Sequence, residues 1–244
     1  MSGGIVAVTS LALEARIALG LGVSVICGQG AHLAAALESA VEDGASGIIS
    51  FGVAGGLAPG LVAGVWIVAA GVKTAQQSFA TDRLWTQALV ERLPGAVQAD
   101  IVGIDTPVAD PLEKQLLHKQ TGAAAVDMES HIAGRIAAAC HVPFAVCRAI
   151  IDAADECLPP AALIGLRTDG TADVVGVFRS VLQKPSQLSA LVRIALNARI
   201  ARAALRQGRR MLGPGLGFPQ FINCVPESRV SARAGSNSPE QVPL

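Results

Sequence analysis

Three acidic residues that are far apart in the sequence, Glu14, Glu129 and Asp152, each come after a short apolar run. A glycine-rich segment, residues 52–56, follows a fourth such run. A carboxyl group can act as a general acid or base when its pKa lies near the working pH, and loss of solvation raises that pKa. The apolar run before Asp152 suits such desolvation. We therefore predict that the three carboxyl groups meet in one pocket beside residues 52–56.

The apolar runs fit the strands of an α/β domain, because short β-branched runs bounded by glycine and proline are typical of buried parallel strands. The predicted strands are residues 5–8, 22–26, 47–51, 65–70, 98–102, 123–126 and 144–151, and the predicted helices start at Glu14, Ala31 and Pro111, with another at 128–140. This alternation favours a largely parallel sheet that is covered on both faces. Ligands bind beyond the carboxyl ends of such strands, where the three acidic residues are expected.

The composition raises the question of a membrane span. Of the 244 residues, 51% are hydrophobic and 16% are charged, the mean hydropathy is +0.49, and residues 44–72 carry no charge. A spanning helix needs about 20 consecutive, mostly apolar residues. Glycines and Pro59 instead divide this stretch into two short runs. We predict two buried strands here and no span.

The net charge, the N-terminal residues and the cysteines exclude further classes of partner, location and site. The 19 basic and 19 acidic residues give a formal net charge of zero, so we expect no nucleic-acid binding. Residues 1–10 lack the basic segment and cleavage pattern of a signal peptide, which favours a cytoplasmic protein. The five cysteines are unclustered and form no Cys-x-x-Cys pair, so we expect neither a disulfide framework nor a metal site.

A basic helix is predicted at residues 186–212, which contain no acidic residue. Arg199, Arg202, Arg206 and Arg209 follow a 3, 4, 3 spacing that places them on one helix face. Two interpretations stay open. The helix packs on the domain with a solvated arginine face, or it lies as a basic amphipathic helix on the anionic inner face of a membrane.

The chain changes character after this helix. Residues 213–221 are rich in glycine and proline, and residues 228–244 are polar, small and proline-containing, without periodicity. We therefore predict one domain, residues 1–212, followed by a disordered tail at 213–244.

Three motifs carry a resemblance to a known family: FGVAGGL at 51–57, AVDMESHIAG at 125–134 and CRAIIDAADECLPPAAL at 147–163. Together they resemble the purine nucleoside phosphorylase and methylthioadenosine nucleosidase superfamily. Within it, the segment 158–163 and the arginine-rich helix are most similar to the bacterial hopanoid-associated phosphorylases. The resemblance implies a three-layer αβα domain with a mixed, largely parallel central sheet, and a homo-oligomer.

The resemblance also assigns roles to the acidic residues. Asp152 stands where relatives place the acid that protonates purine N7, and Glu129 where they bind the ribose hydroxyls, with Met128 packed beneath the sugar. Glu14 matches the residue that takes part in activating the attacking water. Structural alternatives are an Asp152 that caps a turn, a Glu129 that interacts with a helix dipole, and a Glu14 that belongs to an ordinary first helical turn.

Other segments are implied to contact the ligand. Val53, Ala54 and Gly55 are expected to bring the backbone close to it, which bulky side chains would prevent, and to offer amides to the sugar or to an anion. Pro107 and Val108 occupy the segment that cradles the purine in relatives. The usual aromatic stacking residue is absent there.

Three positions depart from the family pattern. Val53 stands where several relatives carry a hydroxyl, Ser50 where the hexameric phosphorylases place an arginine, and Ile151 where a serine commonly precedes the catalytic aspartate. The sequence therefore does not establish phosphate binding. We expect no cofactor, with inorganic phosphate as a candidate co-substrate.

The resemblance implies an enzyme that acts on a small nucleoside. The first hypothesis is the release of adenine from an adenosylated hopanoid lipid, with phosphate or water as the acceptor. The second is a soluble methylthioadenosine or S-adenosylhomocysteine nucleosidase. The third is a catalytically inactive scaffold that binds a nucleoside, an alternative left open by Val53 and Ile151.

Overall fold

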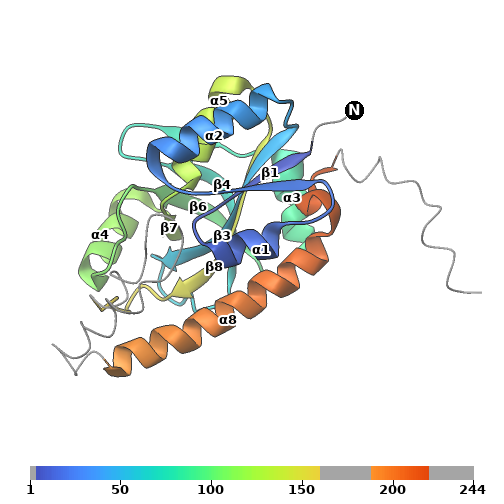
Figure 1. Cartoon of the computed structure of the whole chain (residues 1–244). Helices are drawn as coiled ribbons and strands as arrows, with labels where there is room; N and C mark the ends of the chain where they lie inside the picture. Colours follow the sequence, from blue (N-terminus) through green and yellow to red (C-terminus); the bar gives the residue numbers. More distant parts are fainter. Residues whose placement is uncertain (1–3, 160–187, 220–244) are drawn as a thin grey trace, which may run out of the picture.

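The computed structural model describes residues 4–159 and 188–219 (Figure 1). Its strands are β1 (Ile5–Thr9), β2 (Val23–Cys27), β3 (Gly47–Gly56), β4 (Trp66–Lys73), β5 (Ser78–Ala80), β6 (Val97–Gly103), β7 (Ala125–Asp127) and β8 (Phe144–Asp152). Its helices are α1 (Ala12–Ala18), α2 (Gly30–Glu42), α3 (Arg83–Arg92), α4 (Pro111–Thr121), α5 (Ser130–Cys140) and α8 (Leu188–Leu212), followed by the short 3-10 helix η2 (Pro214–Gly217).

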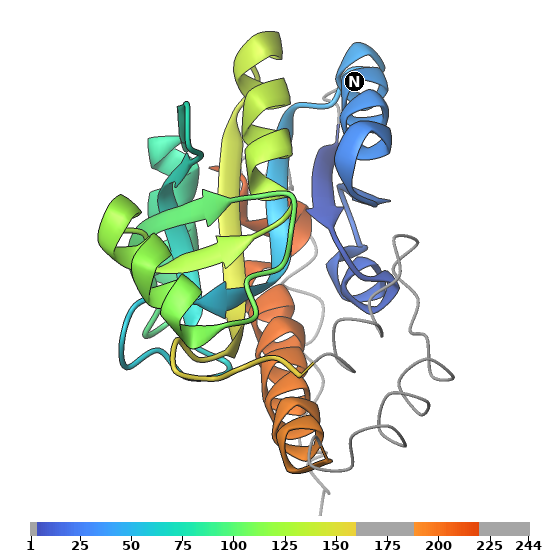
Figure 2. The same cartoon turned by 90° about the vertical axis from the view of Figure 1, so that its left-hand side faces the viewer.

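The strands form one mixed, largely parallel sheet. Its order is β2-β1-β3-β7-β6-β4-β5, and β8 pairs with both β3 and β4. Strands β3, β7, β6, β4 and β8 therefore pair in a closed ring. Figure 2 shows β3 and β8 side by side, and they are parallel, so their carboxyl ends reach the same edge.

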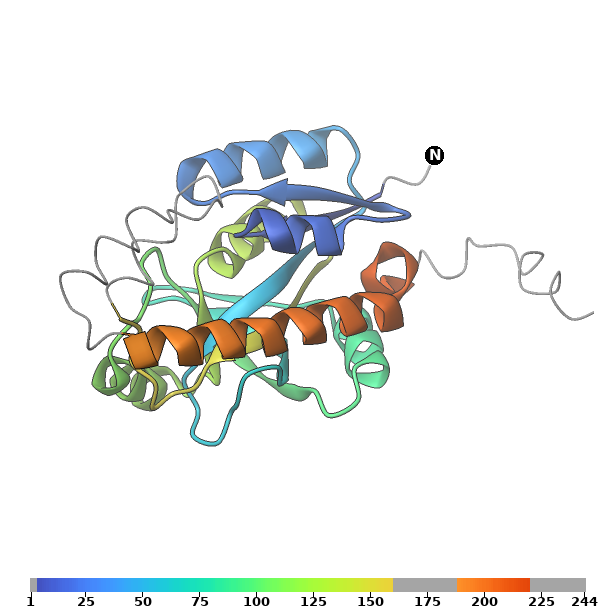
Figure 3. The ribbon, with the colours of Figure 1, turned by 60° about the horizontal axis from the view of Figure 1, so that its bottom comes forward.

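Helices cover both faces of the sheet. Helices α2 and α5 lie on one face, and α1, α3 and α8 on the other (Figures 1 and 3). On β1, Val6 and Val8 pack toward the first group, whereas Ile5 and Ala7 pack toward the second. Side chains alternate along a strand, so an entirely apolar strand fills two cores. This arrangement confirms the expected three-layer α/β domain.

The glycine-rich segment 52–56 is part of a strand that the sequence predicted to end at residue 51. It continues β3, which pairs with β8 and, at its end, with β7. A Cβ atom on Gly52 would lie 2.7 Å from Arg148 Nη1 and 2.8 Å from the carboxyl carbon of Glu14. Gly52 therefore makes room for buried protein side chains. Strand β5 and helix α3, which the sequence did not predict, also lie in the structure.

The packed part of the chain extends beyond the predicted boundary at residue 212. Leu216 and Phe218 are buried, the rings of Phe218 and Trp85 lie 4.7 Å apart, and Trp85 Nε1 donates to the Leu216 carbonyl at 3.0 Å. The prediction of disorder is thus wrong for residues 213–219, because this short segment carries two apolar side chains that complete a core. The rest of the predicted tail, 220–244, lies outside the described residues, as do 160–187.

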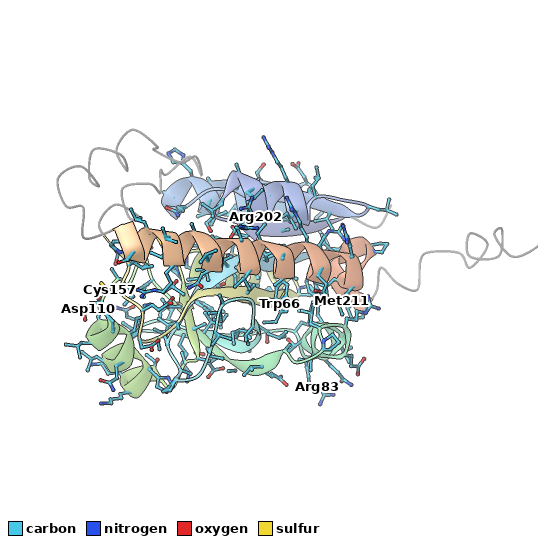
Figure 4. All side chains as sticks on the ribbon, turned by 90° about the horizontal axis from the view of Figure 1, so that it is seen from below. Trp66, Arg83, Asp110, Cys157, Arg202 and Met211 are labelled. Atoms are coloured by element: carbon cyan, nitrogen blue, oxygen red, sulfur yellow. The ribbon has the colours of Figure 1, made fainter. Side chains whose placement is uncertain are left out.

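Helix α8 crosses one face of the molecule beside α1, with Arg202 midway along it and Met211 near its end (Figures 3 and 4). Arg199 and Arg206 are exposed, as predicted for a solvated face. Arg209 differs, because it donates to the carbonyls of Ala18 at 2.9 Å and Gly213 at 2.7 Å. It fastens α8 to the carboxyl end of α1, where a cation is favourable.

Within the described residues, no helix combines the length and hydropathy that a membrane span requires. The uncharged stretch 44–72 forms β3 and most of β4, two buried strands, as predicted.

Candidate active site

A pocket of about 210 Å³ lies at the carboxyl ends of the strands. It is lined by Ser10, Leu11, Gln29, Val53, Ala54, Gly55, Thr106, Pro107, Val108, Val126, Asp127, Met128, Glu129, Ile151, Asp152, Leu158 and Ile194. All the predicted site residues except Glu14 are therefore in its wall. Strand order explains this convergence. Strands β3 and β8 run parallel and end together, and the short strand β7, which Met128 and Glu129 follow, pairs with the end of β3.

Glu14 lies directly behind this wall. Its carboxylate accepts hydrogen bonds from the amides of Val53 at 2.8 Å and of Ser10 and Leu11, both at 3.1 Å. Burial raises the pKa of Glu14, although Arg148 and these amides oppose the rise. The Val53 amide is thus engaged by Glu14 in this structure, whereas its expected contact with a sugar or an anion stays a prediction.

Arg148 is the centre of the buried network beneath the pocket floor. Its guanidinium pairs with Asp127 at 2.8 Å and with Glu129 at 3.1 Å, and it donates to the hydroxyl of Ser50. Arg148 is fully buried, so these partners replace its lost hydration. Ser50, where the hexameric phosphorylases carry an arginine, here serves as a partner of Arg148.

Negative charge exceeds positive charge in this network. Arg148 faces Asp127, Glu129 and Glu14, which is one cation for three carboxyl groups. Burial, opposed by Arg148 and reinforced by Asp127 and Glu14, raises the pKa of Glu129 to about 7. The second oxygen of Glu129 accepts a long hydrogen bond from Gln29 Nε2 at 3.4 Å. Glu129 therefore faces the pocket as a carboxyl group that changes charge near neutral pH.

Asp152 ends β8 at the opposite part of the pocket, beside Ile151 and Leu158. Its Oδ2 pairs with the ammonium of Lys114, a fully buried side chain of α4. Burial, reinforced by the charge of Glu156, raises the pKa of Asp152 above its ordinary value, although the Lys114 ammonium opposes this rise. The desolvation expected from the apolar run before Asp152 is thus present.

Apolar surface dominates the wall beside Asp152. Pro107, Val108, Ile151 and Leu158 all line it, and Val108 is buried. An apolar wall with one acidic group at its edge is typical of a pocket that binds a small molecule. Ile194, from α8, also lines the pocket, so the basic helix contributes to the site.

Sequence reasoning missed Lys114, Arg148, Gln29 and Ile194. Arg148 carried a signal, because it is the one charged residue within the apolar run 144–151 and a buried charge needs partners. Lys114 carried none, because a lysine in the polar segment 111–121 is ordinarily a surface residue.

The described pocket wall contains no lysine or arginine. Across residues 4–159 and 188–219, no group of three or more histidine, cysteine, aspartate or glutamate side chains is arranged to hold a metal ion. The polar side chains of this wall are the carboxyl groups of Asp127, Glu129 and Asp152, the hydroxyls of Ser10 and Thr106 and the amide of Gln29.

The phosphorylase superfamily model matches residues 19–192, more than half of the chain. The fold is similar to that of futalosine hydrolase from Helicobacter pylori, with a TM-score of 0.63 and 15% identity over 87% of this chain and 96% of that one. It is also similar to 5′-methylthioadenosine/S-adenosylhomocysteine nucleosidase from Neisseria meningitidis, with a TM-score of 0.63 and 17% identity over 86% and 98%. No curated protein sequence matches the chain.

The S-adenosylhomocysteine nucleosidase from Streptococcus pyogenes is a further structural neighbour, with a TM-score of 0.56 and 16% identity over 81% of this chain and 97% of that one. The family match confirms the superfamily that the motifs indicated and, with it, an enzyme of the nucleoside phosphorylase or nucleosidase class. The chain belongs to the phosphorylase superfamily.

Proposed function

We propose that this protein cleaves the N-glycosidic bond of a purine nucleoside by hydrolysis. One observation carries the proposal: Asp152 and Glu129, from different strand exits, line a single pocket whose remaining wall is mostly apolar. Asp152 would meet the base, and Glu129 would accept hydrogen bonds from the ribose hydroxyls. Two structural neighbours are named as a hydrolase and a nucleosidase, and we propose the same kind of reaction for this chain.

In this reaction the bond between C1′ and N9 breaks and its electron pair moves into the purine. Asp152 gives its proton to N7, so the base leaves as a neutral molecule, which contributes about 10² to 10⁴-fold in rate. Water adds to C1′ and passes a proton to the hydroxyl of Ser10, which lines the pocket and gives its own proton to Glu14 behind the wall along their 3.1 Å hydrogen bond. Glu129, as a carboxylate, stabilises the positive charge that grows on the ribose ring.

The charges favour water over phosphate as the acceptor. Phosphate sites generally offer cations or free backbone amides. Here the charged residues of the described wall are Asp127, Glu129 and Asp152, all acidic, and Arg148 is held by Asp127 and Glu129. The Val53 amide is bound to Glu14. A phosphate dianion would therefore meet repulsion.

The test is to follow the release of free purine from adenosine, inosine and methylthioadenosine, with and without phosphate. We expect release in phosphate-free buffer and free ribose or its derivative as the second product. Phosphate-dependent release with a sugar 1-phosphate would contradict hydrolysis. Binding of nucleosides without release would contradict the enzymatic proposal.

We further propose adenine as the base and an apolar group on the sugar as part of the substrate, as in an adenosylated hopanoid lipid. The support is the position of α8, because Ile194 lines the pocket while Val192, Leu196 and Ile200 form an exposed apolar row at four-residue spacing on the same helix. Residues two apart on a helix lie about 200° apart, so this row is on the side of α8 away from Ile194. An apolar substituent that leaves the pocket beside Ile194 would pass around α8 to reach it.

The structural neighbours favour a second candidate, a nucleosidase that acts on methylthioadenosine or S-adenosylhomocysteine. Comparing kcat/KM for adenosine, methylthioadenosine and an adenosine with a long 5′-alkyl chain separates the two. A preference that grows with chain length supports the lipid-linked substrate, and a Leu196→Asn, Ile200→Asn variant should reduce it. A preference for methylthioadenosine over the long chain supports the second candidate.

We propose that α8 contacts the anionic inner face of a membrane and that this membrane is a partner in the function. Arg199 and Arg206 are exposed, and so is the apolar row. Binding to vesicles that contain anionic lipid should fall as salt rises. An Arg199→Gln, Arg206→Gln variant should bind less, with Arg135→Gln on α5 as control. Equal binding by parent and variant would contradict the contact.

A further inference from the structure

Lys114 is a fully buried lysine that has no role in the proposed proton transfers. It is fully buried on α4, and its ammonium donates to Asp152 Oδ2, to the Ala153 carbonyl at 2.8 Å and to the Glu156 carbonyl at 2.8 Å. An ammonium has three donors. Each of the three has an acceptor, so the surroundings are built for a charged lysine.

Helix α4 is placed by polar contacts more than by an apolar face. It buries Lys114 fully and Leu117 only in part, whereas Leu112 and Leu116 are 75% and 55% exposed. Asp110 caps its start by accepting from the Leu112 amide at 2.7 Å, and Gly122 ends it in a left-handed conformation. An amphipathic helix ordinarily does the reverse and buries its leucines. The inverted pattern indicates that the burial of Lys114 serves its contacts.

These contacts all lie on the segment that carries the acid of the pocket. Lys114 binds the side chain of Asp152 and two carbonyls of the four residues that follow it. The Leu158 amide then donates to the Ala109 carbonyl at 3.0 Å, next to the start of α4. Figure 4 shows Asp110 and Cys157 close together at this end of the molecule. The ammonium therefore sets where Asp152 stands.

We propose that Lys114 is a positioning residue for catalysis: it holds Asp152 in place and stabilises the carboxylate that Asp152 becomes when it gives its proton to the purine. This rests on the proposed function. Before the transfer, Lys114 faces a neutral carboxyl group; afterwards it faces an anion. Its interaction grows as the reaction proceeds, and an interaction stronger in the transition state than in the ground state accelerates the chemical step.

Two other features keep the acid usable despite the adjacent cation. Burial and Glu156 both favour the protonated form of Asp152 and oppose Lys114. Glu156 is itself held by Arg193 at 3.2 Å and by Asn197 at 2.8 Å, both on α8. The charged groups that face Asp152 or its turn are thus Lys114, Glu156 and, through Glu156, Arg193.

The first test compares Lys114→Met with Lys119→Met, an exposed lysine on the same helix. For Lys114→Met we expect kcat with a purine nucleoside to fall by about 10 to 100-fold. The alkaline limb of its kcat profile should move to higher pH, because Asp152 holds its proton more tightly without the cation. Lys119→Met should match the parent. An unchanged kcat, or a fall without movement of the limb, would overturn the proposal.

A second substrate distinguishes action through Asp152 from general damage to the pocket. p-Nitrophenyl riboside has a leaving group that needs no proton, so Lys114→Met should lower kcat for this substrate by less than threefold. Equal losses with both substrates would mean that Lys114 is structural. Lys114→Gln, which keeps amide donors for the two carbonyls, repeats both measurements if the methionine variant does not fold.

A titration without substrate separates this proposal from the proposed function. The carboxyl carbon of Asp152 can be followed by NMR in protein labelled with ¹³C-aspartate and assigned with Asp152→Asn. Its pKa should be higher in Lys114→Met, or in Lys114→Gln, than in the parent. An unmoved titration overturns the role of Lys114 alone. A parent protein that titrates as expected but releases no purine overturns the proposed function instead.

Discussion

The two ends of the pocket handle buried charge in opposite ways. At the end that we propose binds the sugar, here called the sugar end, Glu14, Asp127 and Glu129 share the cation Arg148. At the end that we propose binds the purine, here called the base end, Asp152 has the ammonium of Lys114 in direct contact. All of these groups are buried, so their charges interact strongly.

The difference teaches how similar carboxyl groups acquire different tasks. With one cation for three carboxyl groups, the sugar end retains excess negative charge, which suits a ring that becomes positive in the transition state. With a partner of its own, Asp152 can lose its proton without leaving an unpaired buried charge. The environment, and not the residue type, separates the acid from the electrostatic stabiliser.

The largest expected effect tests the dependence of the sugar end on one cation. Arg148→Met leaves buried carboxylates uncompensated, and loss of one partner of a buried pair costs about 3–5 kcal/mol. Urea unfolding at pH 7 should report this loss, with part of it recovered at pH 5, where the carboxyl groups take up protons. Arg135→Met, on an exposed arginine of α5, is the control. A loss similar to that control would show that the charges are not coupled as described.

The next effect tests the base end. Asp152→Asn should lower kcat by at least about 100-fold, because the amide cannot protonate N7. Its oxygen still accepts from Lys114, so we expect a folded protein, and circular dichroism serves as the check. A rate equal to that of the parent would remove Asp152 from the reaction and leave the pair with Lys114 as a structural contact.

A smaller effect follows from the raised pKa of Glu129. Its ordinary value is 4.5 and its folded value about 7, so the folded state holds this proton more tightly. The stability that this group contributes is complete below pH 4.5 and is lost as the pH rises through 7. The free energy of unfolding of Glu129→Gln, measured between pH 5 and 8, should fall less with pH than that of the parent. Parallel curves would contradict the assignment.

The smallest expected effect concerns the ribose hydroxyls. A 2′-deoxy substrate should react poorly with the parent, because Glu129 loses a hydrogen-bond donor to accept from. Glu129→Ala should then add little to the defect, since both changes remove the same interaction. The comparison of kcat/KM in a double-mutant cycle checks this, with a 5′-deoxy substrate as control. Additive losses would place Glu129 away from the diol.

Much of the fold could be predicted because local patterns encode it. Short β-branched runs and alanine-rich stretches mark most strands and helices, and the strand order then brings Glu129 and Asp152 to one pocket. The predicted start of the disordered tail at residue 213 was wrong because of tertiary contacts. Leu216 and Phe218 lie in a proline- and glycine-rich segment, yet they complete the core around Trp85.

The site could be predicted only in part. The position of Asp152 follows from its place at the end of a strand. The segment 52–56 lines the pocket through Val53, Ala54 and Gly55, but it does so as part of β3 and not after the end of the strand. Glycine at 52 signals that the backbone approaches something closely without saying what approaches. Here the neighbours of Gly52 are Arg148 and Glu14, which belong to the protein itself.

By itself, the sequence determined the class of fold, the superfamily motifs and three of the carboxyl groups that line or support the pocket, Glu14, Glu129 and Asp152, but not Asp127. These depend on local periodicity and on residue type. The tertiary structure alone decided which cation stands beside which carboxyl group. Lys114 and Asp152 are 38 positions apart, and nothing in the segment around Lys114 marks it as buried. Pairing across such distances depends on how α4 packs against the end of β8, and that packing sets the charge on which the chemistry depends.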